Sequence, residues 1–455
     1  MSFGGLTGTR LRALVQFHED PALVSWWTAR VAPVVGWLDA PRRRRLLALA
    51  ALALAVERIG DRSDGPRWAS WFAAAILLSL CWGVFRVATG LRRLPLVVRS
   101  RPQVFLHALL ALACVAFWTT PAGLLRRVLA AIVPMLPFLV WRLGYLLKTG
   151  QRGKAAGSRF ADHLFYLFPA WGGTNTPYAK GFDYLVSVEA RTPEAFARSQ
   201  LAGVRLILIA LVWRGVTEVM GAVVYADPES ALTSRFAGWT LGVPMLPDLV
   251  RRPGSVPLVV AWMSLYLEFV RLTLRLAAKG HVIVGVARLC GFNAFRNTYK
   301  PLLAESVVEF WNRYYYYFKE LLAEFFFFPT FVRRSRRHPR LRIAAATFAA
   351  AFAGNMYYHT IEQPAFLGGS LRATWAVMHS RLVYCFVLAC GITVSMLREQ
   401  RRRGGTGAPG DGTAGRLRRI AGVWTFFALI HVWAIPGRDP DAFGRMRFFL
   451  SLFGL

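Results

Sequence analysis

The chain has 455 residues, of which 55% are hydrophobic and 14% aromatic, and its 56 basic and 24 acidic residues give a net charge of +32. This apolar share exceeds that of most soluble domains and favours a membrane protein. The charge alone would allow nucleic-acid binding, but the basic residues fall in runs between apolar segments, as the positive-inside rule expects, so we expect no nucleic-acid partner.

In chain order, long apolar segments recur, each close to the roughly 20 residues that a membrane-spanning helix needs. They are Trp68–Leu91, Val104–Leu124, Val128–Leu147, Leu201–Tyr225, Val256–Ala278, Ile343–Ile361, Trp375–Leu397 and Ile420–Ile435. Shorter or mixed segments are candidates for short spans, re-entrant pieces or interfacial helices: Leu46–Val56, Phe160–Trp171, Val282–Phe295, Pro301–Phe331 and Phe448–Leu455. The sequence therefore predicts an all-α, polytopic membrane protein of about 8–11 transmembrane helices plus re-entrant or interfacial helices.

The basic runs define the expected topology and domain organisation. Four runs are expected on the cytoplasmic side: Arg92–Arg101, Lys148–Arg159, Arg333–Arg342 and Arg398–Arg419. The last belongs to a Gly-rich stretch, Leu397–Arg419, that predicts a flexible loop. We expect residues 1–66 to form an N-terminal extension with a short apolar helix, and residues 67–455 to form a single integral-membrane domain.

Several ionisable residues lie inside apolar segments: Arg86, Arg142, Arg214, Glu218, Glu268, Arg271 and Arg275. Helical spacing allows Arg214 to pair with Glu218 and Glu268 to pair with Arg271. Charges in a membrane are costly, so such residues either form internal salt bridges and snorkel at span ends or line a polar chamber. The sequence leaves both interpretations open.

The stretch Pro301–Phe331 contains the sequence "EFWNRYYYYFKELLAEFFFFPTF" and predicts one amphipathic helix that Pro329 ends. Its polar residues fall within roughly 120° of the helical wheel: Glu305, Glu309, Asn312, Arg313, Tyr316, Lys319 and Glu320. The mixed charge favours a face turned into a protein cavity, with Glu309 paired to Arg313, over a basic lipid-binding face. An interfacial helix below a membrane domain is the alternative.

The apolar segment that follows becomes polar only near its end, where Asn355, His359 and Glu362 can share one helix face. His359 lies roughly 25 Å along a helix from Arg342, which places it in the extracytoplasmic half of the membrane. An imidazole near a carboxylate suits a general base, although a structural hydrogen bond would also explain it. His431, by contrast, has no polar neighbours in its span. No HxxxH or HExxH spacing occurs, so we expect no metal site.

Four blocks in this order resemble the membrane-bound O-acyltransferase (MBOAT) superfamily in its bacterial members. They read "PFLVWRLGYLLKTG", "FADHLFYLFPAWGG", "GVARLCGFNAFRNTYKPLLAESVVEFWNRYYYYFKELLAEFFFFPTF" and "VWTFFALIHVWAIPGRDPDAFGRMRFFLSLFGL", and they cover roughly residues 130 to 455. The resemblance implies helices around a central tunnel, with the third block beside it and the family's near-invariant histidine at His359. One departure is Tyr315, which stands where polysaccharide-acetylating members usually have a histidine.

The resemblance implies an enzyme that transfers an acyl group, acetyl among the options, to a hydroxyl of a glycan, lipid or secreted metabolite. The donor would be a thioester such as acyl-CoA, a substrate rather than a bound cofactor. His359 would act as general base and Asn312 would orient a substrate or stabilise the oxyanion. The expected supporting or tunnel-lining residues are Glu362, Asn355, Arg313, Trp311, Tyr315 and Glu309.

The expected partners are membrane lipids, the acyl donor, the hydroxyl-bearing acceptor and, as in members that act on cell-wall polymers, an extracytoplasmic protein. The expected location is the bacterial inner membrane, crossed several times. The alternative from another functional class is a non-enzymatic transporter or flippase that uses the same polar chamber, with His359, Glu309 and Glu305 as a proton relay.

Overall fold

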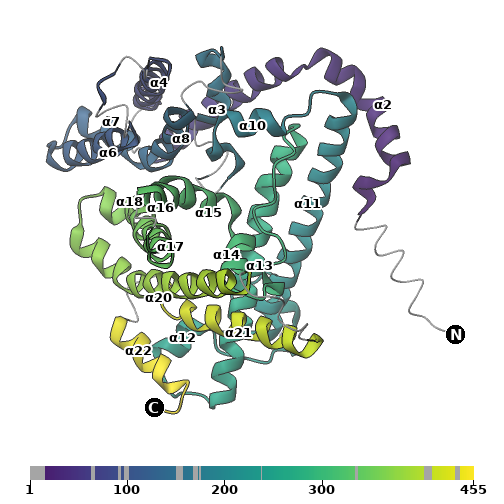
Figure 1. The fold of residues 1–455 in the computed structure, drawn as a ribbon, viewed down its shortest axis with the longest axis vertical. Coiled ribbons are helices and arrows are strands. Elements are labelled where there is room, and N and C mark those ends of the chain that lie inside the picture. Colours follow the sequence, from purple (N-terminus) through teal and green to yellow (C-terminus); the bar gives the residue numbers. More distant parts are fainter. Residues whose placement is uncertain are drawn as a thin grey trace. The chain divides into compact units, whose positions relative to one another are not determined.

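The computed structural model describes residues 16–62, 67–90, 94–96, 102–149, 157–167, 173, 176–236, 238–333, 337–403, 412–435 and 441–455. In these ranges the chain is helical, and the only bridge of β type is an isolated one between Glu189 and Phe292. The prediction of an all-α, polytopic membrane protein is confirmed (Figure 1).

The chain folds as two compact units. The first comprises the residues up to Ala210 together with Gly280–Arg296, and the second comprises Leu211–Lys279 together with Asn297–Leu455. The boundary expected after residue 66 stays a prediction.

The first unit contains eight complete α-helices among its described residues: α2 (Pro21–Trp37), α3 (Ala40–Arg62), α4 (Arg67–Thr89), α6 (Pro102–Thr119), α7 (Leu124–Ile132), α8 (Leu136–Thr149), α9 (Leu164–Leu167) and α10 (Phe182–Val188). It also holds the first part of α11 (Pro193–Val219) and the last part of α13 (Leu258–Leu289). These two parts pack closely because glycines face each other. A Cβ on Gly203 would lie 2.8 Å from the carbonyl oxygen of Gly285.

The second unit carries the predicted site. Its further helices are α12 (Leu246–Arg251), α14 (Val307–Tyr314), α15 (Tyr316–Leu322), α16 (Phe328–Arg333), α17 (Pro339–Thr347), α18 (Asn355–Ile361), α19 (Pro364–Leu367), α20 (Leu371–Arg403), α21 (Thr413–His431) and α22 (Ala442–Ser451). Two π-helical turns, η11 (Ala323–Phe327) and η12 (Phe348–Gly354), connect α15 to α16 and α17 to α18. The long helix α20 packs against α14, α17, α18, α19 and α21 (Figure 1).

Five helical segments in the described part of the chain are long and apolar enough to cross a membrane: Trp68–Thr89, Pro102–Thr119, Leu124–Thr149, Pro193–Val224 and Leu371–Arg401. Each overlaps a predicted span. The other three predicted spans coincide with α13, with α17 to α18 and with α21, which are helical but more polar. A total above five stays a prediction.

Two predictions about local structure are wrong. The stretch Pro301–Phe331 is not one helix, because it breaks at Tyr315, whose φ and ψ are −137° and 72°, and widens into η11. Pro329 does not end it either. This proline is the second residue of α16, directly after the π-helical turn, where the hydrogen-bond register already shifts.

The loop expected at Leu397–Arg419 is also shorter than predicted. Helix α20 continues to Arg403 and α21 begins at Thr413, so helical structure extends well beyond the apolar part of each segment. Residues 404–411, the Gly-rich centre of the expected loop, lie outside the described residues.

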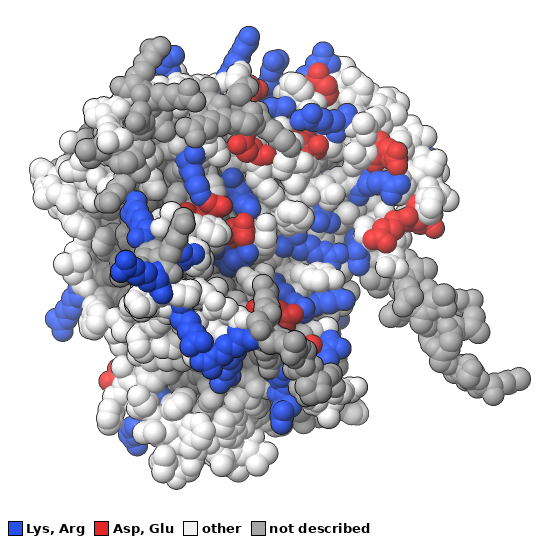
Figure 2. Space-filling view, viewed as in Figure 1, with Lys and Arg blue, Asp and Glu red and all other residues white. Residues whose placement is uncertain are grey.

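In Figure 2 basic side chains outnumber acidic ones on the face in view.

Candidate functional site

The break between α14 and α15 is held by a strap, Asn297–Tyr299, that precedes α14 in the sequence. The carbonyl and side-chain oxygens of Asn297 accept hydrogen bonds from the backbone N–H groups of Tyr316, at 2.9 Å, and Tyr317, at 3.2 Å. The strap thereby satisfies the free donors at the start of α15.

The same strap satisfies the free carbonyls at the end of α14. The backbone N–H of Tyr299 donates to the carbonyl of Arg313 at 2.7 Å, and the Thr298 hydroxyl donates to that of Tyr314 at 2.8 Å. Asn297 and Thr298 are both buried. Because backbone groups at the end of α14 and at the start of α15 have hydrogen-bond partners in the strap, the break is stabilised by the fold. Helix α15 can therefore take a direction different from that of α14.

The polar side of α14 is organised around Glu309. Ser306 caps the helix and accepts a hydrogen bond from the backbone N–H of Glu309 at 3.2 Å. The Glu309 carboxylate accepts from the backbone N–H of Glu305 at 2.6 Å and forms an ion pair with Arg313. The predicted pairing of Glu309 with Arg313 is confirmed, and about one-third of each side chain is exposed.

The remaining charges of the predicted polar face find separate partners. Glu305 binds the guanidinium groups of Arg416 and Arg419, at 3.0 and 2.9 Å. Lys319 pairs with the adjacent Glu320 at 2.6 Å. Because the helix breaks at Tyr315, these residues do not form one continuous face, and the predicted single polar face is wrong.

His359 lies on α18 and borders an aromatic cluster. The ring centroid of Phe318 lies 6.1 Å from that of His359 and 4.6 Å from that of Tyr358. The same Phe318 ring contacts Trp311 at 6.2 Å and Tyr315 at 6.4 Å. The structure thus brings three residues together around Phe318: Trp311 of α14, His359 of α18, and Tyr315, which lies at the break between α14 and α15.

His359 makes no hydrogen bond to any residue that the structure describes. The expected orienting groups are nearby in sequence but do not bond to it. Asn355 Oδ1 and Glu362 Oε1 are buried, and neither atom has a hydrogen-bond partner in the described ranges. The predicted hold of Asn355 or Glu362 on the imidazole is therefore absent from this arrangement. The His359 imidazole and Asn355 Oδ1 remain available to a ligand, whereas the Glu362 carboxyl is hydrogen-bonded to the Tyr358 side chain.

Asn312 lies apart from this cluster. It is exposed on α14, whereas its neighbour Trp311 is only 8% exposed. Among the described residues no hydrogen bond or ring contact joins Asn312 to His359. Its expected role in catalysis stays a prediction.

Arg381 and Tyr384 of α20 were missed by the sequence reasoning. Helix α18 packs against α20, and the Arg381 charge acts electrostatically on His359 and Tyr384. The signal was present, because Arg381 is an arginine within the predicted span Trp375–Leu397. A charge inside an apolar segment is costly, and this cost is the signal that marks Arg381 in the sequence.

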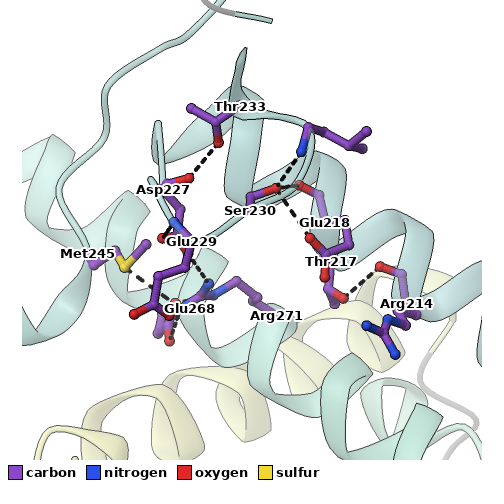
Figure 3. Close-up of polar contacts among 11 residues, drawn as sticks. Arg214, Thr217, Glu218, Asp227, Glu229, Ser230, Thr233, Met245, Glu268 and Arg271 are labelled. Atoms are coloured by element: carbon purple, nitrogen blue, oxygen red, sulfur yellow. Dashed lines mark hydrogen bonds and ion pairs between the residues drawn. The ribbon is translucent and has the colours of Figure 1, made fainter. Parts of the chain in front are cut away.

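A second polar cluster surrounds Arg271 on α13 (Figure 3). The predicted pair with Glu268 is confirmed, with both carboxylate oxygens in contact at 2.8 and 3.1 Å. Arg271 also approaches Asp227 at 3.5 Å and the Met245 sulfur at 3.9 Å. These bonds favour the salt-bridge interpretation at this position.

The other predicted pair is wrong. Arg214 is exposed and forms no ion pair with Glu218 among the described residues. Instead, Glu218 accepts a hydrogen bond from the Ser230 hydroxyl, at 3.3 Å to its carboxylate and 3.1 Å to its carbonyl (Figure 3). Ser230, in the turns that follow α11, is thus the partner of Glu218, where the sequence spacing predicted Arg214.

Other histidines have structural surroundings. In the first unit, His163 is fully buried, with Nε2 2.8 Å from the Ser158 hydroxyl and Nδ1 2.8 Å from the Tyr166 hydroxyl. Burial lowers the pKa of His163 to about 4. His431 was expected to lack polar neighbours, but its Nδ1 lies 2.5 Å from the Phe427 carbonyl. Both imidazoles are held in place, unlike His359.

No group of three or more His, Cys, Asp or Glu residues that could hold a metal occurs in the part of the chain that the structure describes. A cavity of about 120 Å³ opens among α12, α13 and α22, lined by residues that include Leu249, Val256 and Phe448, and is separate from His359. No family model matches this chain, and no curated protein matches it significantly.

Proposed function

We propose that the chain is a membrane-embedded O-acyltransferase of the MBOAT type. It would transfer an acyl group from a thioester such as acyl-CoA to a hydroxyl of a glycan, lipid or secreted metabolite. The observation that carries the proposal is the state of His359. Its imidazole lies beside an aromatic cluster, and no described residue hydrogen-bonds to it, so a substrate hydroxyl can do so.

In the proposed reaction the acceptor hydroxyl oxygen attacks the thioester carbonyl carbon and forms the new C–O bond. His359 takes the hydroxyl proton as this bond forms. The tetrahedral intermediate then breaks its C–S bond, and the leaving thiolate takes the proton from the His359 imidazolium to give the free thiol and restore the neutral base. Asn312, which is exposed on α14, would donate a hydrogen bond to the developing oxyanion from that side.

The aromatic rings of Trp311, Phe318 and Tyr358 give this site an apolar wall. Trp311 and Phe318 are each 8% exposed and Tyr358 is 7% exposed. Such a wall suits an acyl chain and excludes water, which would otherwise hydrolyse the thioester. We infer that the acyl chain lies along this wall, with its carbonyl toward His359.

We propose a bacterial inner-membrane location, with the donor entering from the cytoplasmic side, where the positive-inside rule places the basic loops. Contacts within the second unit support one consistent topology. Glu305 binds Arg416 and Arg419 near the start of α21, and Ser306 donates to Glu399 near the end of α20. Glu399, Arg416 and Arg419 belong to the run expected on the cytoplasmic side, so these contacts would place Glu305 and Ser306 there as well, and His359 lies toward the opposite end of its helix.

The experiment compares purified parent protein with a His359→Ala variant, and measures release of free thiol from acetyl-CoA with and without a panel of hydroxyl acceptors. We expect acceptor-dependent thiol release in the parent and a loss of about 10²–10⁴-fold in the variant. His338→Ala is the matched control, because that histidine is exposed ahead of α17.

Thermal melting run alongside separates chemistry from folding. Equal activity of parent and His359→Ala would overturn the mechanism. Lost activity with a collapsed melting curve would assign His359 a structural role. Transbilayer movement of an acceptor lipid without thiol release would favour the flippase alternative.

A further inference from the structure

Arg381 is a charged residue with no counterion among the residues that the structure describes. It lies in α20, ten residues or roughly 15 Å along the helix from Leu371, within a segment apolar enough to span a membrane. Its side chain is half-buried. Among the described residues Arg381 forms no hydrogen bond and no ion pair, which distinguishes it from Arg271 and Arg313.

An arginine at the end of this helix behaves differently. Arg372, one residue after the start of α20, is exposed and can place its guanidinium in water. Arg381 lies more than two turns deeper, so solvent contact costs it more. A guanidinium that stays inside a span without a carboxylate is expensive, and such residues commonly mark a ligand path.

The surroundings of Arg381 add positive charge. Its charge acts on His359, Tyr384 and Arg445. Arg445 is fully buried and donates to the carbonyls of Val432 and Ile435 at 2.8 and 3.0 Å, so two guanidinium groups share this part of the second unit. A second positive charge makes an anion, rather than another cation, the favourable ligand.

Polar atoms on α18 complete the arrangement. Asn355 precedes His359 by one helical turn, and its Oδ1 is buried with no partner in the described ranges. This oxygen can accept a hydrogen bond from a hydroxyl. The side of α18 that carries His359 therefore offers a hydroxyl acceptor and a base, while α20 offers a cation.

We propose that Arg381 binds an anionic group, phosphate or carboxylate, on the hydroxyl-bearing acceptor. The assignment rests on the proposed acyl transfer only for calling this ligand the acceptor. It narrows the acceptor to phosphorylated or acidic compounds, either soluble or as lipid headgroups. A guanidinium donates two parallel N–H bonds to the two oxygens of a phosphate or carboxylate. Neutral sugars and alcohols have no negatively charged oxygen pair to accept them.

The test measures binding rather than turnover, with full-length protein in detergent or nanodiscs. The soluble probes are glycerol 3-phosphate and glucuronate, each compared with its uncharged counterpart, glycerol or glucose. The lipid arm compares nanodiscs that contain phosphatidylglycerol with nanodiscs that contain only diacylglycerol as the added lipid. Dissociation constants are measured for the parent, Arg381→Gln, Arg381→Lys and the control Arg372→Gln.

We expect an anionic probe to bind the parent and to bind Arg381→Gln about tenfold or more weakly, because a charge-assisted contact is lost. Arg372→Gln should match the parent, and Arg381→Lys should fall between the two. The arm that shows the effect identifies phosphate, carboxylate or lipid headgroup as the ligand.

Three outcomes would overturn the assignment: equal affinity of parent and Arg381→Gln, equal affinity for charged and uncharged probes, or no binding of any anionic probe. The result is separable from the proposed chemistry. His359→Ala should still bind the anion, and a parent that binds it yet releases no thiol would reject acyl transfer while leaving the anion site in place.

Discussion

The ring of Phe326 in η11 lies against the backbone of Gly354 in η12. A Cβ on Gly354 would lie only 2.7 Å from two atoms of that ring. The two π-helical turns thereby pack together, and η12 ends five residues before His359 of α18. Extra width in a helix exposes backbone to a neighbour, and here the missing side chain of Gly354 makes room for a phenyl ring.

Gly354→Ala should therefore destabilise the protein, by about 1–3 kcal/mol for an overpacked position. Gly422→Ala on α21 is the matched control, because a Cβ there meets no atom within 4 Å and alanine favours a helix. Thermal melting of both variants provides the measurement. A Gly354→Ala, Phe326→Leu double variant should recover part of the loss, and a loss that the second change leaves untouched would contradict direct contact.

Glu309→Ala should cost more stability than Arg313→Ala. The Glu309 carboxylate accepts from both Arg313 and the backbone N–H of Glu305, the latter at 2.6 Å. Besides the ion pair, Arg313 makes a longer and weaker hydrogen bond, of 3.4 Å, to the Lys300 carbonyl. Because both side chains are about one-third exposed, the coupling between them should be about 1 kcal/mol or less. A double-mutant cycle followed by melting measures it, and a larger loss for Arg313→Ala would contradict this ranking.

Single cysteines at Leu417 and Phe443 should lie on opposite sides of the membrane. Both residues are exposed, at 61% and 71%, near the start of α21 and in α22. The positive-inside rule places the basic start of α21 in the cytoplasm. A membrane-impermeant maleimide added to intact cells should label position 443 and leave 417 unlabelled until the cells are opened. The parent, with its native cysteines, reports background, and equal labelling of both positions would refute the topology.

Acid should destabilise the first unit through His163. Burial lowers its pKa to about 4, against about 6.5 in an unfolded chain. The native state therefore binds fewer protons than the unfolded state between these values, and stability falls as pH decreases from 6.5 to 4, by up to about 3 kcal/mol.

His163→Gln removes that titration, so its melting temperature should depend less on pH across the same window. Its stability at pH 7 should still fall, because the bonds to Ser158 and Tyr166 are altered. His338→Gln, at an exposed position, controls for the general effect of the substitution. Parallel pH profiles for the parent and His163→Gln would argue against a buried neutral imidazole.

Two of the three ion pairs that helical spacing suggested were accessible from the sequence, whereas the third, Arg214 with Glu218, was not formed among the described residues. The Glu309–Arg313 and Glu268–Arg271 pairs follow from a spacing of three or four residues. The all-α membrane class follows from long apolar segments, because a helix satisfies its own backbone inside a bilayer. The polar end of the helix that carries His359 was also predicted correctly, because four residues separate Asn355 from His359 and this spacing places them one turn apart.

Only the tertiary structure decided what depends on segments far apart in the chain. Asn297 breaks the predicted helix at Tyr315 by bonding to Tyr316 and Tyr317, about twenty residues later, and no local pattern records that competition. Tertiary packing likewise places Glu305 in ion pairs with Arg416 and Arg419, which lie more than one hundred residues later. A helical pattern determines which neighbouring residues share a face. The partner of a buried group depends instead on which distant segment packs beside it and offers a complementary donor or acceptor.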